Sequence, residues 1–502
     1  MRSSVLGTGG SYAFGLVAIP LALHLLGPGL FGVWVALATV LAVGGLADLG
    51  VRTEIARRVS AALGEQRQAE IPQIVMQGTT LLMLTAGILV GVGLLVTPYL
   101  VAAVFPHATG PEIGQLQLVM RAVVGVVGLS VVLNGYFAVL AGVQRPDVQA
   151  YSGLAGVVAG FAVLLSGLLF GWGIWALFAG EATQVVVQSA IQAAWTRVLV
   201  PELGLRSLRL SPSGLGSYLS LSTMVLVLQV ADVVDAQWDK LVLSRYVGAT
   251  AVASFQVGTT LVLGARGLAL LPLAPLLVAV TELGGERSKQ LYARLSKATM
   301  ALSVMALTGL IVFAQPFMAL WLGQHSSVVG QSALVARMFA LAMLANLVTV
   351  APVLRCLALG RHRVAATQAV VNVVINGAVS VALTIHIGLV GALIGSIVGN
   401  CASIATLAMA LRREPARDWL SVPWATMALG TILAATLWAT GVVPASWTWW
   451  QLLPAAGGFL LLLGLDSVRI DALEPGQVMR GALLGQTEAP GHGHPAPQSS
   501  AA

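Results

Sequence analysis

The sequence predicts an all-α polytopic membrane protein of about 14 transmembrane helices, forming two parallel-repeat six-helix lobes around a central cavity plus two extra C-terminal helices. Three observations support this fold class. Hydrophobic residues make up 57% of the 502 positions and charged residues only 9%, a balance that no water-soluble domain of this size would tolerate. The apolar residues form long runs, and the opening part of the chain recurs later.

The apolar runs are long enough to cross a bilayer, because about 20 residues of helix span the ~30 Å hydrocarbon core. They cover 5–26, 30–50, 73–96, 118–141, 150–170, 174–195, 222–247, 250–277, 298–321, 333–357, 366–386, 389–411, 421–441 and 451–468. With the amino terminus inside, most of the 26 Lys and Arg fall in inner segments, which predicts that both termini are cytoplasmic. The net charge of +7 therefore reflects topology, and we expect no nucleic-acid partner.

The runs also predict the domain organisation. We expect an N-terminal lobe at 1–200, a C-terminal lobe at 201–415, two additional helices at 416–468 and a disordered cytoplasmic tail at 469–502. The largest outer loop is expected at about 97–117, so no separate soluble domain is predicted between spans. Cys356 and Cys401 both lie inside apolar runs and outline neither a disulfide framework nor a metal site.

An internal repeat relates the two lobes. A shift of 221 positions aligns Gly27 with Gly248 and Trp34 with Phe255. Because each half contains an even number of spans, the repeats are parallel. The shift also extends the seventh span to Val247. Shorter matches between the two halves occur at slightly different shifts. They pair Arg121 with Arg337, Gly142 with Gly360 and Arg145 with Arg363.

The extended seventh span carries a stripe of polar side chains. Gln229, Asp232, Asp235 and Asp239 are spaced by three, three and four, so they share one helix face. A charge at the bilayer centre costs ~2.5 to 3.5 kcal/mol on insertion scales, so this face is expected to meet a cavity or a partner rather than lipid. Arg266 lies about as far after Gly248 as Asp232 lies before it, which predicts that the two meet at one depth.

Two interpretations of these charges remain open. In the functional one, Arg266, with Arg121 and Arg337 nearer the outer surface, binds an anionic substrate, while Asp232 and its stripe exchange protons or cations. In the structural one, Arg266 and Asp232 tie adjacent helices, and the other arginines reach the outer interface. Further candidate lumen or gate residues are Asp48, Arg52, Glu181 and Gln229. Asp48 with Arg52, and Glu54 with Arg58, also have the four-residue spacing of ordinary helix pairs.

Several local motifs carry a family resemblance. They are LLGPGLFGVWVAL, GLADLG, a basic inner loop ending LGEQ, and WDKLVLSRYVGATAVASFQV in the second half. With these motifs, over roughly residues 1–415, the chain resembles the polysaccharide transporter family of Wzx-type flippases in the multidrug/oligosaccharidyl-lipid/polysaccharide (MOP) exporter superfamily. The motifs identify the superfamily better than the substrate.

The resemblance implies a V-shaped pair of lobes that opens alternately to the two sides of the bacterial inner membrane. It implies a flippase, not an enzyme, that moves an undecaprenyl-diphosphate-linked oligosaccharide to the periplasmic leaflet for cell-surface polysaccharide synthesis, as for the O-antigen of lipopolysaccharide. We expect no cofactor beyond H⁺ or Na⁺ coupling, and a monomer that works with polysaccharide polymerase machinery.

Other functions remain as alternatives. A lipid II flippase and a MATE-like cation-coupled drug exporter belong to the same superfamily, and the acidic stripe suits the exporter while the arginines oppose it. A membrane polymerase or ligase is expected to need a large outer loop, which the sequence does not predict. A scaffold without transport would not need charges at mid-depth.

Overall fold

The structure is a computed structural model that describes residues 2–44, 50–106, 108–201, 223–270, 285–358, 360–412, 424–439, 443–444 and 446–469. Within these ranges it contains fourteen α-helices and no strand, and nine of the helices are long and apolar enough to cross a membrane. This confirms the predicted all-α polytopic fold. The helices are α1 (Arg2–Gly44), α2 (Val51–Gly64), α3 (Ile71–Val104), α4 (Gly110–Gly142), α5 (Pro146–Leu169), α6 (Ile174–Leu199), α8 (Thr223–Tyr246), α9 (Ala249–Leu270), α11 (Gly285–Leu322), α12 (Val329–Ala358), α13 (His362–Ile387), α14 (Leu389–Ala410), α16 (Trp424–Ala439) and α17 (Trp449–Arg469).

Several helices are longer than the apolar runs that predicted them. The prediction of an outer loop at 97–117 is wrong, because α3 continues to Val104 and α4 already begins at Gly110. The side chains of Thr109 and Glu112 cap the start of α4. Hydropathy detects the apolar middle of a helix, whereas the helix itself continues as long as its backbone hydrogen bonds do.

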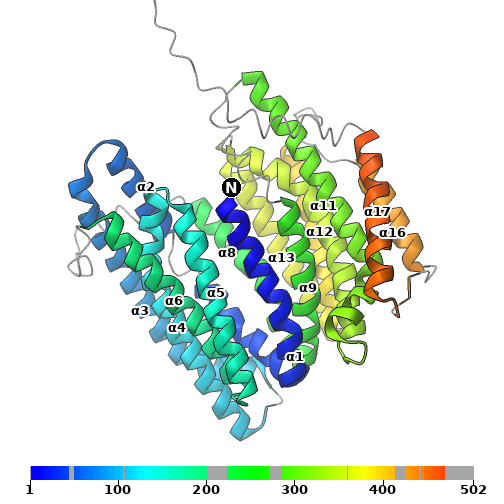
Figure 1. The fold of residues 1–502 in the computed structure, drawn as a ribbon, viewed down its shortest axis with the longest axis horizontal. Helices are drawn as coiled ribbons and strands as arrows, with labels where there is room; N and C mark the ends of the chain where they lie inside the picture. Colours follow the sequence, from blue (N-terminus) through cyan, green and yellow to red (C-terminus); the bar gives the residue numbers. More distant parts are fainter. Residues whose placement is uncertain are drawn as a thin grey trace, which may run out of the picture.

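The helices form two groups (Figure 1). Helices α2 to α6 lie on one side, α9 and α11 to α14 lie on the other, and α1 and α8 run between them. The largest hydrophobic core includes residues of both groups, among them Trp34 and Phe255, which the repeat aligns. Helices α16 and α17 pack on α11, where Phe313 contacts the ring of Phe459.

Tight turns recur at matching places in the two groups. Gly27, which breaks α1 into two helical segments, and Gly248, before α9, both have positive φ, at 76° and 111°. Gly173 before α6 and Gly388 before α14 share nearly the same φ and ψ, at 58° and −133° and at 61° and −136°. These conformations favour glycine, so they explain why the sequence repeats it there.

The turn after α4 corrects one predicted match between the two halves, that of Arg145 with Arg363. Arg145 N donates to the carbonyl of Leu140, five residues back, and Arg361 N donates in the same way to Cys356. Arg145 therefore corresponds to Arg361, not to Arg363. The same shift of 216 positions relates Arg121 to Arg337, whereas the predicted match of Gly142 with Gly360 needs a shift of 218 and does not belong to this alignment.

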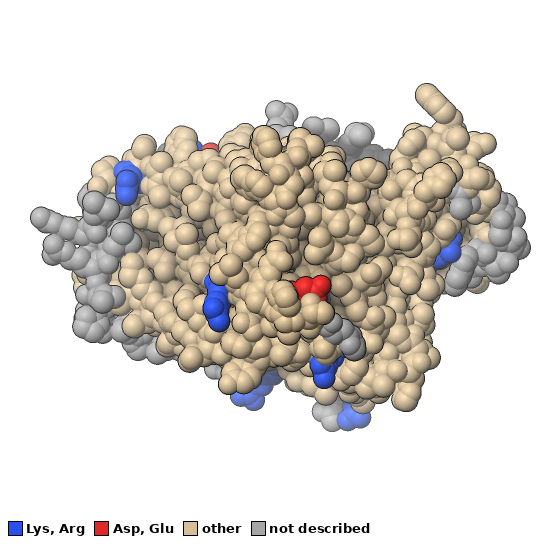
Figure 2. Space-filling view, turned by 90° about the horizontal axis from the view of Figure 1, so that it is seen from below, with Lys and Arg blue, Asp and Glu red and all other residues tan. Residues whose placement is uncertain are grey.

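The two groups meet at the end of the molecule that carries Gly27 and Gly248, which we call the glycine-turn end. Gly32 of α1 lies against α9 so closely that a Cβ added to it would be 1.8 Å from the carbonyl oxygen of Ala249. Seen from this end, the surface carries few charged side chains, separated by wide uncharged areas (Figure 2). In the predicted topology this is the outer face, where few positive charges are expected.

At the same end, hydrogen bonds join α8 to α3. The hydroxyl of Ser244 donates to the carbonyl oxygen of Val104 at 3.1 Å, and Arg245 Nη1 donates to the carbonyl oxygen of Ala103 at 3.1 Å. Both acceptors belong to the last turn of α3, where carbonyls have no helical donor and a cation is favourable. The two lobes are thus fastened at the glycine-turn end.

Each group also contains a helix pair in which main chains approach very closely. In the C-terminal group, a Cβ on Gly395 of α14 would be 2.1 Å from Ser380 Oγ of α13. In the N-terminal group, a Cβ on Gly160 of α5 would be 2.6 Å from the carbonyl oxygen of Gly180 in α6. Small residues let the backbones approach, as in other membrane helix pairs.

Candidate functional site

The aspartate stripe of α8 faces two neighbouring helices. Asp239 is buried, with only 3% of its surface exposed, and its Oδ2 accepts a hydrogen bond from Ser396 Oγ at 3.1 Å. Asp235 Oδ1 accepts from Asn376 Nδ2 at 3.0 Å. Asp232 is exposed and lies within electrostatic range of Arg266. Two members of the stripe therefore meet protein partners on α13 and α14, as the cost of isolated charges requires.

Helix α13 supplies a polar stripe that the sequence analysis missed. Its buried side chains recur at every fourth position and lie on one face: Gln368, Asn372, Asn376, Ser380 and Thr384. The signal was present in the sequence as a four-residue period within an apolar run. Glycines of α14 pack against this stripe, so polar groups and main chain come into direct contact.

An oxygen-rich pocket surrounds Asp239. Ser380 Oγ lies near the carboxylate, and its single proton has two further acceptors within reach, the main-chain oxygen of Ala392 at 3.2 Å and Asn376 Oδ1 at 3.0 Å. Asp239 Oδ1 and Asn372 Oδ1 are both buried and have no hydrogen-bond donor among the described residues. Unpartnered carboxylate and amide oxygens suit a proton or a hard cation. Within the described ranges no cluster of three or more His, Cys, Asp or Glu forms a metal site.

A chain of hydrogen bonds connects Arg266 to this pocket. Arg266 Nη2 donates to Asn346 Oδ1 at 2.8 Å, and Asn346 Nδ2 donates to Asn400 Oδ1 at 2.8 Å. Asn400 Nδ2 donates to the carbonyl oxygen of Ser396 at 2.8 Å, and the hydroxyl of Ser396 reaches Asp239. The chain crosses α9, α12, α14 and α8. Arg266 thus bonds to an amide that the sequence analysis did not identify.

The other two candidate arginines occupy different surroundings. Arg337 is half-buried on α12, and its Nε donates to the carbonyl oxygen of Ile311 on α11 at 3.2 Å. That carbonyl lies one residue before the one that Pro316 leaves without a helical donor. Arg121 lies exposed on α4 in the N-terminal group. Arg337 therefore ties α12 to α11, a contact that neither interpretation of the charges predicted.

The remaining candidates lie mainly in the N-terminal group. The guanidinium of Arg52 stacks over the ring of Phe137, with 4.9 Å between Arg52 Cζ and the centroid of the ring. Glu181 on α6 is half-buried, as is Gln229 on α8. Asp48 lies outside the described residues.

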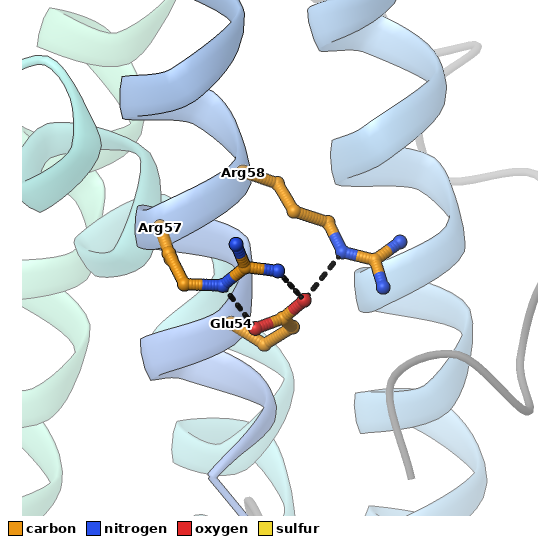
Figure 3. A network of polar contacts seen from close by, with 3 residues as sticks. All are labelled: Glu54, Arg57 and Arg58. Carbon is orange, nitrogen blue, oxygen red and sulfur yellow. Dashed lines mark hydrogen bonds and ion pairs between the residues drawn. The ribbon is translucent and has the colours of Figure 1, made fainter. Parts of the chain in front are cut away.

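Glu54 binds two arginines on α2, which lies beyond the apolar spans (Figure 3). It accepts from Arg57 Nε at 2.8 Å and Nη2 at 2.6 Å, and from Arg58 Nε at 2.7 Å. The predicted pair of Glu54 and Arg58 is confirmed, and Arg57 adds a second partner. The hydrogen bond from Arg57, above all, holds the pKa of Glu54 below its ordinary value of 4.5 although burial opposes the shift.

Comparison with known proteins identifies the fold. No protein-family model and no curated protein matches the chain. A solved structure of the lipid II flippase MurJ in an inward closed conformation matches 96% of this chain and 99% of that chain, with a TM-score of 0.72 at 12% identity.

Drug transporters match less closely. An inward-facing multidrug resistance MATE family transporter of the MOP superfamily matches 87% of this chain and 96% of its own, with a TM-score of 0.57 at 17% identity. The eukaryotic MATE transporter AtDTX14 matches 86% and 97%, with a TM-score of 0.57 at 12% identity. The structural neighbours are thus a lipid II flippase and MATE transporters, one of them described as a member of the MOP superfamily, and the chain shares their fold.

Proposed function

We propose that the chain is a flippase that moves an undecaprenyl-diphosphate-linked oligosaccharide from the cytoplasmic to the periplasmic leaflet of the bacterial inner membrane. The observation that carries the proposal is Arg266, a cation held within the helix bundle by Asn346, in a chain with the fold of a flippase. A guanidinium stays charged and donates in a planar fork, which fits a diphosphate. The product would serve cell-surface polysaccharide synthesis, such as that of the O-antigen of lipopolysaccharide.

Alternating access and ion coupling complete the proposal. The lobes fastened at the glycine-turn end leave the opposite end as the side from which substrate enters. Asp239, assisted by Asp235, takes up a proton or sodium ion in its oxygen-rich pocket, and Asp232 lies next to the path of the substrate. Arg121 and Arg337 stay secondary candidates for the anionic group. We propose a monomer with both termini cytoplasmic, working beside polysaccharide polymerase machinery.

Two alternatives from the same superfamily have specific support. The match to 99% of a lipid II flippase chain favours lipid II itself as the substrate. The carboxylates of Asp235 and Asp239 favour a cation-coupled drug exporter, because an acidic lumen attracts cationic drugs. The substrate used in transport assays distinguishes the three.

The test measures translocation by purified protein in lipid vesicles. A fluorescent undecaprenyl-diphosphate oligosaccharide, fluorescent lipid II and ethidium serve as alternative substrates. We expect the oligosaccharide to be flipped, Arg266→Ala to abolish flipping, and Arg266→Lys to restore part of it because the charge returns without the fork. Asp232→Asn tests the neighbouring carboxylate. Normal flipping by folded Arg266→Ala would show that this arginine is structural.

A further inference from the structure

In the hydrogen-bond chain between Arg266 and Asp239, each amide side chain can be oriented in only one way. A guanidinium can only donate, so Asn346 must turn its amide oxygen toward Arg266 and its NH₂ toward Asn400. At the other end, the carbonyl oxygen of Ser396 can only accept, so Asn400 must turn its NH₂ toward it. Both amides are therefore fixed by the groups at the ends. Neither can turn over without breaking two hydrogen bonds.

Ser396 has a choice of acceptor at the carboxylate end. Its single hydroxyl proton lies within reach of Asp239 Oδ2 at 3.1 Å and of the main-chain oxygen of Ala392 at 3.4 Å. An ionised carboxylate attracts the proton more strongly than a carbonyl does. Once a proton or cation neutralises Asp239, the carbonyl becomes the better acceptor. The charge of Asp239 thus selects the orientation of Ser396.

The surroundings make this selection strong. Asp239, Ser396 and Asn400 are buried, with 3%, 5% and 3% of their surfaces exposed, so water screens them poorly. The charged groups nearest the carboxylate are Asp235 and Lys240 of its own helix. In contrast, α13 and α14 present amides, hydroxyls and glycines to it. When the charge of Asp239 changes, the hydrogen bonds with α13 and α14 are therefore the first contacts to rearrange.

We propose that Asn346 and Asn400 form a relay that couples the charge state of Asp239 to the position of Arg266. Neutralising the carboxylate releases the Ser396 hydroxyl, shifts the turn of α14 that holds Asn400, and through Asn346 moves the guanidinium. This inference rests on the proposed function, because it makes the affinity of Arg266 for a diphosphate depend on the coupling ion. By linkage, diphosphate binding in turn changes the ion affinity of Asp239.

A purely structural role for the two asparagines predicts something different. Leucine at one position leaves the other amide buried without its partner, which lowers stability, but a loss of stability alone does not remove a response to ions. If the asparagines only pack α12 against α14, then leucine at either position leaves the response of diphosphate affinity to ions unchanged. If they form a relay, the response disappears even in a folded protein.

The test measures the affinity of full-length protein in nanodiscs for undecaprenyl diphosphate, at acidic and alkaline pH, with and without sodium chloride. We expect the wild-type affinity to change about tenfold between conditions, within the usual range of coupling between sites. Asn346→Leu, Asn400→Leu and Ser396→Ala are expected to bind with one affinity under all conditions. The pH and sodium arms show which ion neutralises Asp239.

The controls separate the possible failures. Ser403→Ala removes another buried hydroxyl of α14, outside the chain, and should keep the wild-type response. Ser396→Ala is the smallest change and remains informative if a leucine variant does not fold, since it deletes only the group that senses Asp239. Variants that keep the full response, or a wild type without one, overturn the relay while leaving the flippase proposal intact. A wild type that does not bind undecaprenyl diphosphate overturns both.

Discussion

Gly32 and Ala249 bring the two lobes into contact through their main chains. A Cβ on Gly32 would lie 1.8 Å from the carbonyl oxygen of Ala249 and 2.6 Å from its carbonyl carbon, far inside any allowed contact. Both residues follow the glycine turns that the internal repeat places at Gly27 and Gly248. The repeated turns therefore meet each other, and the space between them has no room for a side chain.

Gly32→Ala is expected to force the lobes apart at this point. The expected loss of stability is about 1 to 3 kcal/mol, as for other overpacked sites, and transport should fall with it. Gly29→Ala is the matched control, because a Cβ there meets nothing within 4 Å. Thermal unfolding in detergent checks the prediction, and equal unfolding temperatures for the two variants would contradict the close contact.

Ser244→Ala and Arg245→Ala are expected to loosen the glycine-turn end. Each removes a hydrogen bond to the last turn of α3, worth about 0.5 to 1.5 kcal/mol. The readout is labelling of Val104→Cys by a membrane-impermeant maleimide, in a Cys401→Ser background because Cys401 is exposed. Faster labelling in the variants supports a closed end that these bonds hold, and unchanged labelling opposes it.

Gly395→Ala is expected to disrupt the Asp239 pocket. The added Cβ would lie 2.1 Å from Ser380 Oγ and 2.7 Å from Ser380 N, so α13 and α14 must separate. Flipping should then lose its dependence on pH or sodium. Gly153→Ala, where a Cβ meets nothing within 4 Å, is the control in a vesicle assay run across both conditions. A variant with wild-type ion dependence would show that the pocket does not need this packing.

Glu54→Gln is expected to remove a stabilisation that depends on pH. Because the pKa of Glu54 is lower in the folded protein, its ion pairs stabilise above the ordinary value of 4.5, and that contribution is lost as pH falls through the folded-state pKa. The difference between wild type and variant should be roughly 1 kcal/mol at neutral pH and should shrink in acid. Glu65→Gln, at an exposed pair with Arg67, should change little. Thermal unfolding across this pH range measures both, and a pH-independent difference would argue against the ion pairs.

The sequence predicted features that depend on local pattern. The shift of 221 positions located both glycine turns, and it extended the seventh span toward Val247 in agreement with α8, which ends at Tyr246. Four-residue spacing predicted the pair of Glu54 and Arg58. Each of these features follows either from residues close together in the sequence or from a repeated stretch, and both can be read directly from the sequence.

Side-chain partners across helices were harder to predict. Nearly equal distances from Gly248 give Asp232 and Arg266 a similar depth, but they do not give the rotation of either helix about its axis. The hydrogen bond of Arg266 consequently goes to Asn346, on a helix distant in sequence. The stripe of α13 was missed because single amides in an apolar run have little effect on hydropathy, although their period of four marks one face.

The contacts at the glycine-turn end share one property: on one side of each contact the chemistry is supplied by the main chain. Val104, Ala103 and Ala249 contribute carbonyl groups, which any residue in their place would also contribute. A substitution at Ala103 or Val104 keeps the carbonyl acceptor, whereas α8 and Gly32 carry the sequence-specific half of these contacts. The closure therefore needs specific side chains on only one of its two sides.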